Sequence, residues 1–512
     1  MNDKQGCFMG AALSFVDKDY LDRQPPAEAQ VLPDRGFAER LVAEADDLQA
    51  LLLLLGRTDP EKQWTRSDIT ALLAGMLVRL DRLLNEQLNA ILHHPEFRAL
   101  EANWRGLLLL ADQVVESDNE GLVRVRVLDL SWKMLRKDLT RSIEFDHSRL
   151  FAKIYSEEFG NPGGEPFGLL LGAYTISHRT EGGQSNMDIL KELSRVGAAA
   201  FAPVIVNADP SFFGVDHFAD LTAVSELESH FSQPELVKWR ALRQEEDARF
   251  LGITMPRMMM RPPHLGPGQG IEGFRFRESG SNAARDYLWG PACFGFGTVA
   301  IRAFCESGWF AQIRGYRPER VAHGVVDNLP SIQKSTETGA LFPSRNAVDW
   351  QITDRMERAL ADEGFVPLAP LANTEMLTFH SVPSVQEPAT YGKPAADMSA
   401  RLSAMLHYTL CVSRFAHYLK VMGRDRVGGY RTPEDCEEQL RKWLRSYTMA
   451  SEGASDEMRA RFPLRDAQVS VKARVGDPGK FYSVIRLQPH FQIDQLVTGM
   501  KLITELTPVN RI

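Results

Sequence analysis

The stretch NPGGEPFGLLLGAY, residues 161–174, contains residue types that could bind phosphate, because two adjacent glycines stand beside an apolar run. A glycine-rich loop binds an anion when a helix follows it, since the backbone N–H groups of the helix N-terminus then face the ligand. Here the glycines follow a predicted helix, 148–160, and precede a predicted strand, and no Gly-Lys-Ser/Thr follows. The order therefore predicts a helix end and a turn into a buried strand.

The motif GQGIEG, residues 268–273, matches the G-x-G-x-x-G pattern of dinucleotide-binding loops. It follows the proline loop RPPHLGP and precedes FRFRESG, which does not have a helical pattern. Without the strand before it and the helix after it, this pattern has little specificity. We expect a surface loop and no cofactor site.

Histidine and cysteine are the other candidates for chemistry. His93 and His94 are adjacent, so on a helix they point about 100° apart and cannot share a metal ion well. His407 and His417 lie ten residues apart on one predicted helix, and Cys411 is out of register with His417 for a nucleophile–base pair. The sequence has no H-E-x-x-H, G-x-S-x-G or C-x-x-C motif. We expect structural roles for these residues, with no catalytic, cofactor-binding or metal-binding residues.

The composition is that of a globular protein with two to four domains: 512 residues, 44% hydrophobic and 25% charged. A net charge of −8 with mixed signs argues against general nucleic-acid binding. Five scattered cysteines indicate reduced thiols in a cytoplasmic protein. The leucine run 51–56 is too short to span a bilayer, and the apolar stretch 7–16 is followed by DKDYLD, where a signal peptide would have the small residues of its cleavage site.

Helices are predicted for the first part of the chain. Residues 1–60 form a flexible segment with one helix over 36–56, and residues 61–120 form a helical region. Ser67 can cap a long helix that Pro95 ends, because apolar residues recur every three or four positions from Ile69 to Leu92. A second amphipathic helix carries Leu100, Trp104, Leu107, Leu108 and Val114.

Strands and helices alternate in the predicted core, residues 121–394, which indicates an α/β fold with a partly parallel sheet. The predicted strands are 122–130, which alternates with period two, 167–174 and 202–208, and the predicted helices are 186–202 and 234–250. A buried helix is predicted over 286–309, where Gly290, Gly295 and Gly297 suggest close packing against a neighbour. Residues 339–371 add a strand, a helix and a strand.

The last part, residues 395–512, combines predicted helices at 397–426 and 433–448 with strands at 467–475, 481–491 and 495–506. The terminal strand alternates, and one of its faces is formed by Leu496, Thr498, Met500, Leu502, Thr504 and Leu506. An exposed strand edge invites pairing, either within the chain or with another chain. The charged stretch 238–249 leaves a similar choice between a solvated helix face with local ion pairs and a subunit contact.

Long blocks of the sequence resemble the large subunit of the type VI secretion contractile sheath, the TssC/VipB family. The resemblance runs from about residue 66 to the end and is carried by EANWRGLLLL (101–110), YSEEFGNPGGEPFGLLLGAY (155–174), AAAFAPVIVNADPSFFGVDHFADL (198–221), KWRALRQEEDARFLGITMPRMMMRPP (238–263), YLWGPACFGFGT (287–298), SRFAHYLKVMGRDRVGG (413–429) and RLQPHFQID (486–494).

The resemblance implies a structural protein with a phage-tail-sheath-like α/β fold and an added helical N-terminal region. It implies assembly with a small, TssB/VipA-like sheath subunit into a helical tube around an inner, Hcp-like tube, attached to a baseplate. Contraction of the sheath expels the inner tube, and neighbouring protomers exchange terminal strands, which fits 495–506. A ClpV-type AAA+ ATPase recycles the contracted sheath through a helix near the N-terminus, but residues 1–60 match the family poorly and show no clear motif.

Three alternatives remain open from the sequence. The chain could be a second, divergent large-subunit paralogue, a phage-type tail sheath protein outside secretion, or a soluble α/β enzyme. An enzyme would require convergent polar residues at strand ends beside a pocket, and no such set can be assembled from the sequence.

Overall fold

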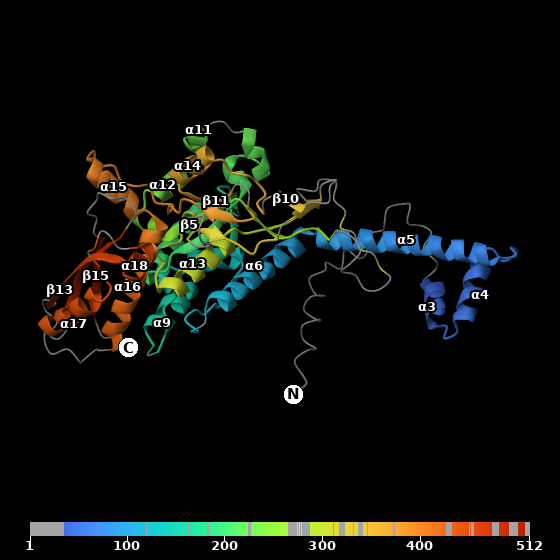
Figure 1. Ribbon diagram of the computed structural model, residues 1–512, viewed down its shortest axis with the longest axis horizontal. Coiled ribbons are helices and arrows are strands. Elements are labelled where there is room, and N and C mark those ends of the chain that lie inside the picture. The colour runs from blue at the N-terminus through green and yellow to red at the C-terminus, as the bar shows by residue number, and fades with distance from the viewer. Residues whose placement is uncertain are drawn as a thin grey trace. The chain divides into compact units, whose positions relative to one another are not determined.

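The computed structural model divides into two compact units, residues Met1–Leu83 and Leu84–Ile512, which are described separately (Figure 1). The structure describes residues 35–118, 120–161, 163–181, 184–223, 227–264, 274, 276, 278, 287–310, 312–316, 323–330, 332–335, 341–345, 347–371, 374–425, 433–449, 451, 455–473, 481–490 and 500–506.

The first unit contains two short helices and the start of a long one. Their bounds are α3 Arg35–Ala43, α4 Asp47–Thr58 and α5 Arg66–Leu92. The prediction of a single helix over 36–56 is wrong, because Asp46 caps a new helix: its carboxylate accepts a hydrogen bond from the N–H of Leu48 at 3.1 Å.

The predicted long helix is confirmed as α5, but its cap is not Ser67. The hydroxyl of Thr65 accepts from the N–H of Asp68 at 3.3 Å, and the carboxylate of Asp68 accepts from the N–H of Thr65 at 3.1 Å. This reciprocal arrangement pairs two N–H groups that the helix itself leaves unbonded.

A six-stranded mixed sheet forms the centre of the second unit, in the order β1-β4-β5-β11-β12-β8. The pairs β1–β4, β4–β5 and β5–β11 are parallel, whereas β11–β12 and β12–β8 are antiparallel. The bounds are β1 Leu170–Ile176, β4 Val204–Ala208, β5 Leu251–Met255, β11 Phe365–Pro370, β12 Leu377–Phe379 and β8 Val325–Val326. The predicted α/β core with a partly parallel sheet is confirmed.

Three two-stranded ribbons and a set of helices surround this sheet. The ribbons are β2 Thr180–Glu181 with β3 Gln184–Ser185, β6 Met258–Arg261 with β7 Leu288–Gly290, and β9 Ile332–Ser335 with β10 Leu341–Arg345. The helices are α6 Pro95–Ser117, α7 Trp132–Arg141, α8 Arg149–Phe151, a π-helical turn Ala152–Ser156, α9 Glu157–Phe159, α10 Asn186–Ala200, α11 Leu227–Phe231, α12 Val237–Arg243, α13 Cys293–Ser307 and α14 Asp354–Asp362.

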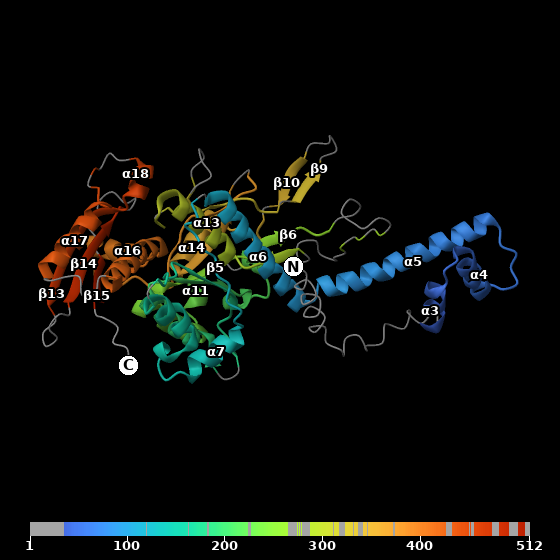
Figure 2. The same ribbon diagram turned by 90° about the horizontal axis from the view of Figure 1, so that it is seen from below.

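Each face of the sheet is covered by helices. Successive side chains of a strand point to opposite faces, so Val204 and Val206 of β4 join one apolar core with α10, while Ile205 between them joins a second core with α13 and α6. Figures 1 and 2 show α13 and α6 lying next to each other beside the central strands. Both cores are built from buried aliphatic and aromatic side chains.

Three sequence expectations for this region need correction. Residues 122–130 have no regular secondary structure and form no strand pair with any other described residue. The buried helix predicted from 286 begins only at Cys293, and Gly290 lies in β7. The helix predicted over 234–250 is α-helical only in α12, with 3-10 turns on either side.

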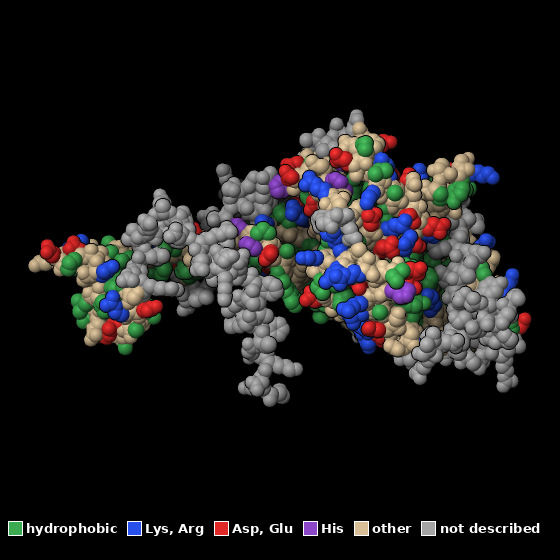
Figure 3. Space-filling view, turned by 180° about the vertical axis from the view of Figure 1, so that it is seen from behind, with side chains coloured by type: hydrophobic (Ala, Val, Ile, Leu, Met, Phe, Trp, Pro, Cys, Tyr) green, Lys and Arg blue, Asp and Glu red, His purple; other side chains and the backbone are tan. Residues whose placement is uncertain are grey.

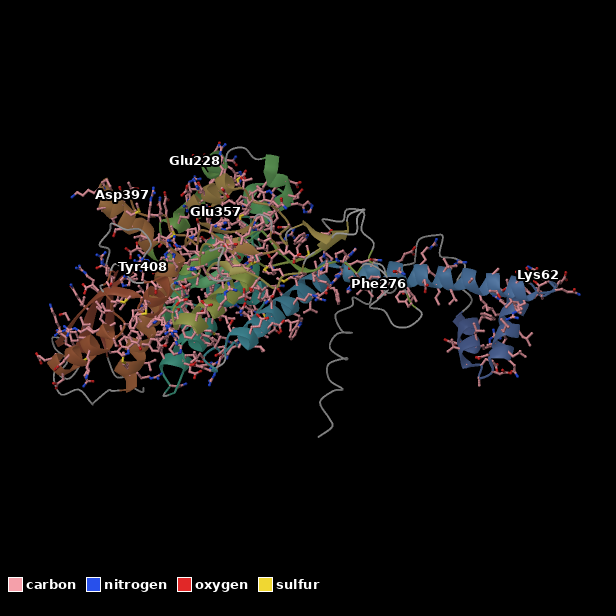
Figure 4. All side chains as sticks on the ribbon, viewed as in Figure 1. Lys62, Glu228, Phe276, Glu357, Asp397 and Tyr408 are labelled. Carbon is pink, nitrogen blue, oxygen red and sulfur yellow. The ribbon has the colours of Figure 1, made fainter. Side chains whose placement is uncertain are left out.

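The C-terminal part forms a three-stranded antiparallel sheet, β13-β14-β15, with four helices. The bounds are α15 Pro394–Ser403, α16 Leu406–Asp425, α17 Pro433–Arg445, α18 Asp456–Arg461, β13 Leu464–Ala473, β14 Phe481–Pro489 and β15 Met500–Leu506. The single helix predicted over 397–426 is two helices, α15 and α16. Tyr408 near the start of α16 is buried (Figure 4), and Figure 2 shows α16 and α17 beside the sheet.

Candidate assembly interface

The C-terminal sheet packs one face on α16 and α17. Val471 of β13 and Ile485 and Leu487 of β14 are buried in one cluster with Phe415 of α16 and Leu440 of α17. Because burial of alternate residues fixes the register of a strand, this cluster holds the pairing of β13 with β14 in place.

The residues predicted for strand exchange lie in or next to β15. Leu496 and Thr498 fall outside the described residues. The remaining four are in β15, whose register places Met500 opposite Leu487, Leu502 opposite Ile485, Thr504 opposite Ser483 and Leu506 opposite Phe481. In the isolated chain β15 therefore pairs with its own β14, and its exchange between subunits stays a prediction.

The two edges of this sheet differ. At the β13 edge, the N–H of Val471 donates to the carboxylate of Glu437 on α17 at 3.1 Å, and Thr448 forms a parallel bridge with Leu464. At the β15 edge, the described part of the chain provides no further strand. The β15 edge is therefore the one at which another chain can add a strand.

The glycine stretch 161–174 is a turn between α9 and β1, as predicted. Gly163 has φ +82°, and a β-carbon on Gly164 would lie 2.1 Å from the carbonyl oxygen of Glu158, so the tight turn requires glycine. Arg424 of α16 donates to the carbonyl oxygens of Glu158 and Asn161 at 3.2 and 3.0 Å. The turn is thus tied to the helix that supports the C-terminal sheet.

Lys420, one helical turn before Arg424, strengthens the same connection. Its ammonium group lies 4.9 Å from the ring centre of Tyr155, 5.1 Å from that of Phe159 and 4.6 Å from that of Phe201. Burial lowers the pKa of Lys420 to about 8. Aromatic faces attract a cation, so α16 is held against the α9 turn and the end of α10.

A buried ionic network fixes the start of α6. Arg261 of β6 donates through Nε to Glu101 of α6 at 2.8 Å and through Nη1 to Glu278 at 2.7 Å. Glu278 also contacts Nε2 of His93 at 3.1 Å and accepts from the N–H of His264 at 2.9 Å. His93, for which the sequence predicted a structural role, belongs to this network.

The other residues considered for chemistry are buried or dispersed. Burial raises the pKa of the Cys293 and Cys411 thiols to about 12, so neither is a thiolate at neutral pH. Burial lowers the pKa of His417 to about 3, and its Nε2 lies 2.9 Å from the carbonyl oxygen of Ala200. The motif 268–273 lies outside the described residues.

The exposed side chains of Glu144, Asp146 and His147 are close enough to one another to hold a metal ion. The sequence did not indicate this group, because its members are three ordinary surface residues at a short 3-10 turn, Phe145–His147. Exposed acidic groups of this kind are common without a metal, and nothing else at this position points to a ligand.

The charged stretch 238–249 forms ion pairs between elements of the same chain. Arg243 of α12 donates to Glu363 at 2.8 Å, and Lys238 donates to Asp188 of α10 at 2.8 Å. The expected ion pairs are present, but they join distant segments. A subunit contact through this stretch stays untested.

Apolar side chains lie exposed along α6. Leu100, Trp104 and Leu108 are 55, 63 and 56% exposed, and their spacing of four residues places them on one face of the helix. The opposite face packs on α13, where Gly106 approaches Phe294. Elsewhere, Lys and Arg side chains are interspersed with Asp and Glu on the face shown in Figure 3.

Comparisons with known proteins agree with this architecture. A family profile described as "EvpB/VC_A0108, tail sheath N-terminal domain" matches residues 74–386, and one described as "EvpB/VC_A0108, tail sheath gpW/gp25-like domain" matches residues 395–506. The type VI secretion system sheath protein TssC1 of Pseudomonas aeruginosa is 33% identical over 444 residues, which cover 86% of this chain and 87% of that protein. No helix among the described residues has the length and apolar character needed to cross a membrane.

Proposed function

The chain belongs to the VipB family of tail sheath proteins and is a structural large subunit of the type VI secretion contractile sheath, and from this premise we propose how it assembles and acts. It pairs with a small sheath subunit, and the pairs polymerise as a helical tube in the cytoplasm. The tube surrounds an inner, Hcp-like tube, starts from a baseplate and contracts to expel the inner tube. A ClpV-type ATPase then recycles the contracted sheath.

The observation that carries this proposal is the extent of the family matches. Both sheath domains match in order and together reach from residue 74 to residue 506. The fold supports an assembling role, because an open β15 edge and exposed apolar residues on α6 are features of surfaces that receive a partner.

We propose that the chain acts by assembly and not by catalysis. The cysteines Cys293 and Cys411 are buried thiols, and His417 bonds to a backbone carbonyl, so these residues support packing. The function resides in the stored energy of the polymer rather than in a substrate pocket.

Co-expression with the small sheath subunit tests the proposal. Negative-stain electron microscopy of the purified product should show tubules of uniform diameter. A chain that stays monomeric beside the small subunit would contradict the proposal. A chain that joins tubules only when a separate large subunit is also present would be a divergent paralogue.

A further inference from the structure

The segment 122–130 has a backbone with few partners. The N–H groups of Leu122 and Val123 donate to the carboxylate of Asp118 at 2.9 and 2.7 Å, and the carbonyl of Leu130 accepts from the Tyr174 hydroxyl at 2.6 Å. Between these ends, the described residues provide no backbone hydrogen bond to residues 124–129. An extended backbone with free donors and acceptors is a template for a further strand.

Side chains hold this segment beside the start of β1. Arg124 pairs with Glu165 at 2.8 Å, and Arg126 donates to Glu158 of α9 at 2.5 Å while its guanidinium lies 5.4 Å from the ring centre of Phe167. The bond from Tyr174 to Leu130 ties the other end of the segment to β1. Long side chains thus join the segment to the α9 turn and to β1, and among the described residues no backbone hydrogen bond does so.

The neighbouring edge of the central sheet is also open. β1 is the first strand in the sheet order and pairs only with β4 among the described strands. β4 and β5 are buried along their whole length, whereas most of β1 is only half-buried. Charged residues and proline protect natural edge strands from pairing with other chains. The sequence of β1, LLGAYTI, contains neither.

The segment exposes four large apolar side chains beside its charged ones. Leu122, Val125, Val127 and Leu128 are 52, 45, 68 and 50% exposed. The period-two pattern that predicted a strand here is thus present without the strand partner. Large apolar groups exposed together in this way mark a surface that another protein covers.

We propose that a β-strand of the small sheath subunit pairs with residues 122–130 and completes this edge. The inference rests on the proposed function, which supplies the partner. A permanent partner fits this segment better than a second copy of the chain. An unpaired backbone that carries exposed apolar side chains promotes aggregation unless a partner covers it before the tube polymerises. Copies of this chain contact each other only in the tube, whereas a permanent partner forms a more hydrophobic interface of the kind that these side chains suit.

Hydrogen exchange of the full-length complex with the small subunit tests the proposal. The amides of 124–128 should exchange on the order of a hundredfold more slowly than those of the exposed residues Ala389 and Thr390 in the same sample. Fast exchange at 124–128 in a complex that is intact would overturn the proposal and leave the proposed function standing. Protection that arises in the chain alone, and grows with its concentration, would show that a second copy is the occupant and would also overturn it.

Two proline variants provide the matched genetic test. Neighbouring N–H groups of a strand point to opposite edges, so V125P and L128P remove donors on both sides. At least one should lower the small subunit recovered by co-purification about tenfold, whereas V125I and L128I should recover it fully. If both proline variants bind like the isoleucine controls, the proposal is wrong. If the unaltered chain recovers no small subunit, the proposed function fails as well.

Discussion

Gly106 of α6 lies against the ring of Phe294 on α13, so closely that a β-carbon on the glycine would be 2.3 Å from Cδ2 of the ring. A second contact exchanges the roles of the two helices: a β-carbon on Gly297 of α13 would be 2.6 Å from a methyl group of Leu110 on α6. Each helix therefore provides a glycine that admits a large side chain of the other, and this sets their separation.

We expect G106A to destabilise the second unit by about 1–3 kcal/mol, because a buried helix contact has no room for a methyl group. Chemical denaturation of the full chain in complex with the small subunit measures the change. G75A is the control, since nothing lies within 4 Å of the position of its β-carbon; it should be neutral or stabilise α5 by up to about 1 kcal/mol. Equal effects of the two substitutions would refute this account of α6.

The ionic network around Arg261 should be sensitive to loss of its central cation. R261M removes the cation that the buried Glu278 and the half-buried Glu101 share, and their remaining partners are His93 and the N–H of His264 for Glu278 and Arg105 for Glu101. Loss of the central cation of a buried ionic network costs about 3–5 kcal/mol. R105M removes a more exposed partner of Glu101 and should cost at most about 1 kcal/mol. Denaturation midpoints at neutral pH, compared with that of the unaltered chain, should fall much further for R261M than for R105M.

The effect of R261M should also depend on pH. Burial alone would raise the pKa of Glu101 and Glu278, but their hydrogen bonds to Arg261 hold both pKa values below 4.5. The network therefore contributes its full stability above about pH 4.5 and loses it as the pH falls further. The difference between R261M and the unaltered chain should shrink on acidification; a constant difference would contradict the proposed charge pairing.

His417 should make the protein less stable in mild acid. Burial lowers its pKa from 6.5 to about 3, so below pH 6.5 the unfolded chain takes up a proton that the folded chain does not. Stability is complete above pH 6.5 and should fall by up to about 1.4 kcal/mol per pH unit below it. H417Q keeps a donor for the Ala200 carbonyl and should flatten the fall between pH 6.5 and 5. An unchanged slope in thermal unfolding would show that His417 is not responsible.

Local patterns predicted most elements, because helix and strand periods depend on short stretches of sequence. The long helix α5, α10, β4 and the C-terminal strands follow the expected spacing of apolar residues. The end of one helix and the start of the next were missed where a single polar residue separates them, as Asp46 does between α3 and α4. β5 was missed because LGITM follows a charged stretch and is buried on both sides.

Long-range relationships could not be predicted from the sequence. Arg261 and Glu101 are 160 residues apart, and only the packing of α6 on β6 and β7 brings them together. Close packing was expected at Gly295 and Gly297 and is present, but the sequence could not name the partners, which lie on β6 and β8 for Gly295 and on α6 and β1 for Gly297. For residues 122–130 the pattern predicted a half-buried strand that the structure does not contain, because a strand also requires a partner that the described part of the chain does not provide.

The C-terminal strand provides the test of exchange between subunits. Deleting residues 495–512 removes β15 and leaves β14, whose alternating residues Ile485 and Leu487 remain buried against α16 and α17. The heterodimer should therefore still form, because the segment proposed to bind the small subunit is 122–130. Tubules should not form if β15 links neighbouring protomers, as the strand-exchange prediction holds, because that strand is gone. Co-purification and negative-stain microscopy of the same preparation distinguish these two steps.

A shorter deletion controls for the loss of chain length. Removing only residues 507–512 keeps all of β15, so the backbone bonds of β14 with Met500–Leu506 are preserved, and tubules should form as in the unaltered chain. If the long truncation polymerises equally well, β15 serves only its own chain and the exchange prediction is wrong. If the long truncation also fails to bind the small subunit, β15 is required for the chain to fold or to form the heterodimer, a step that precedes polymerisation.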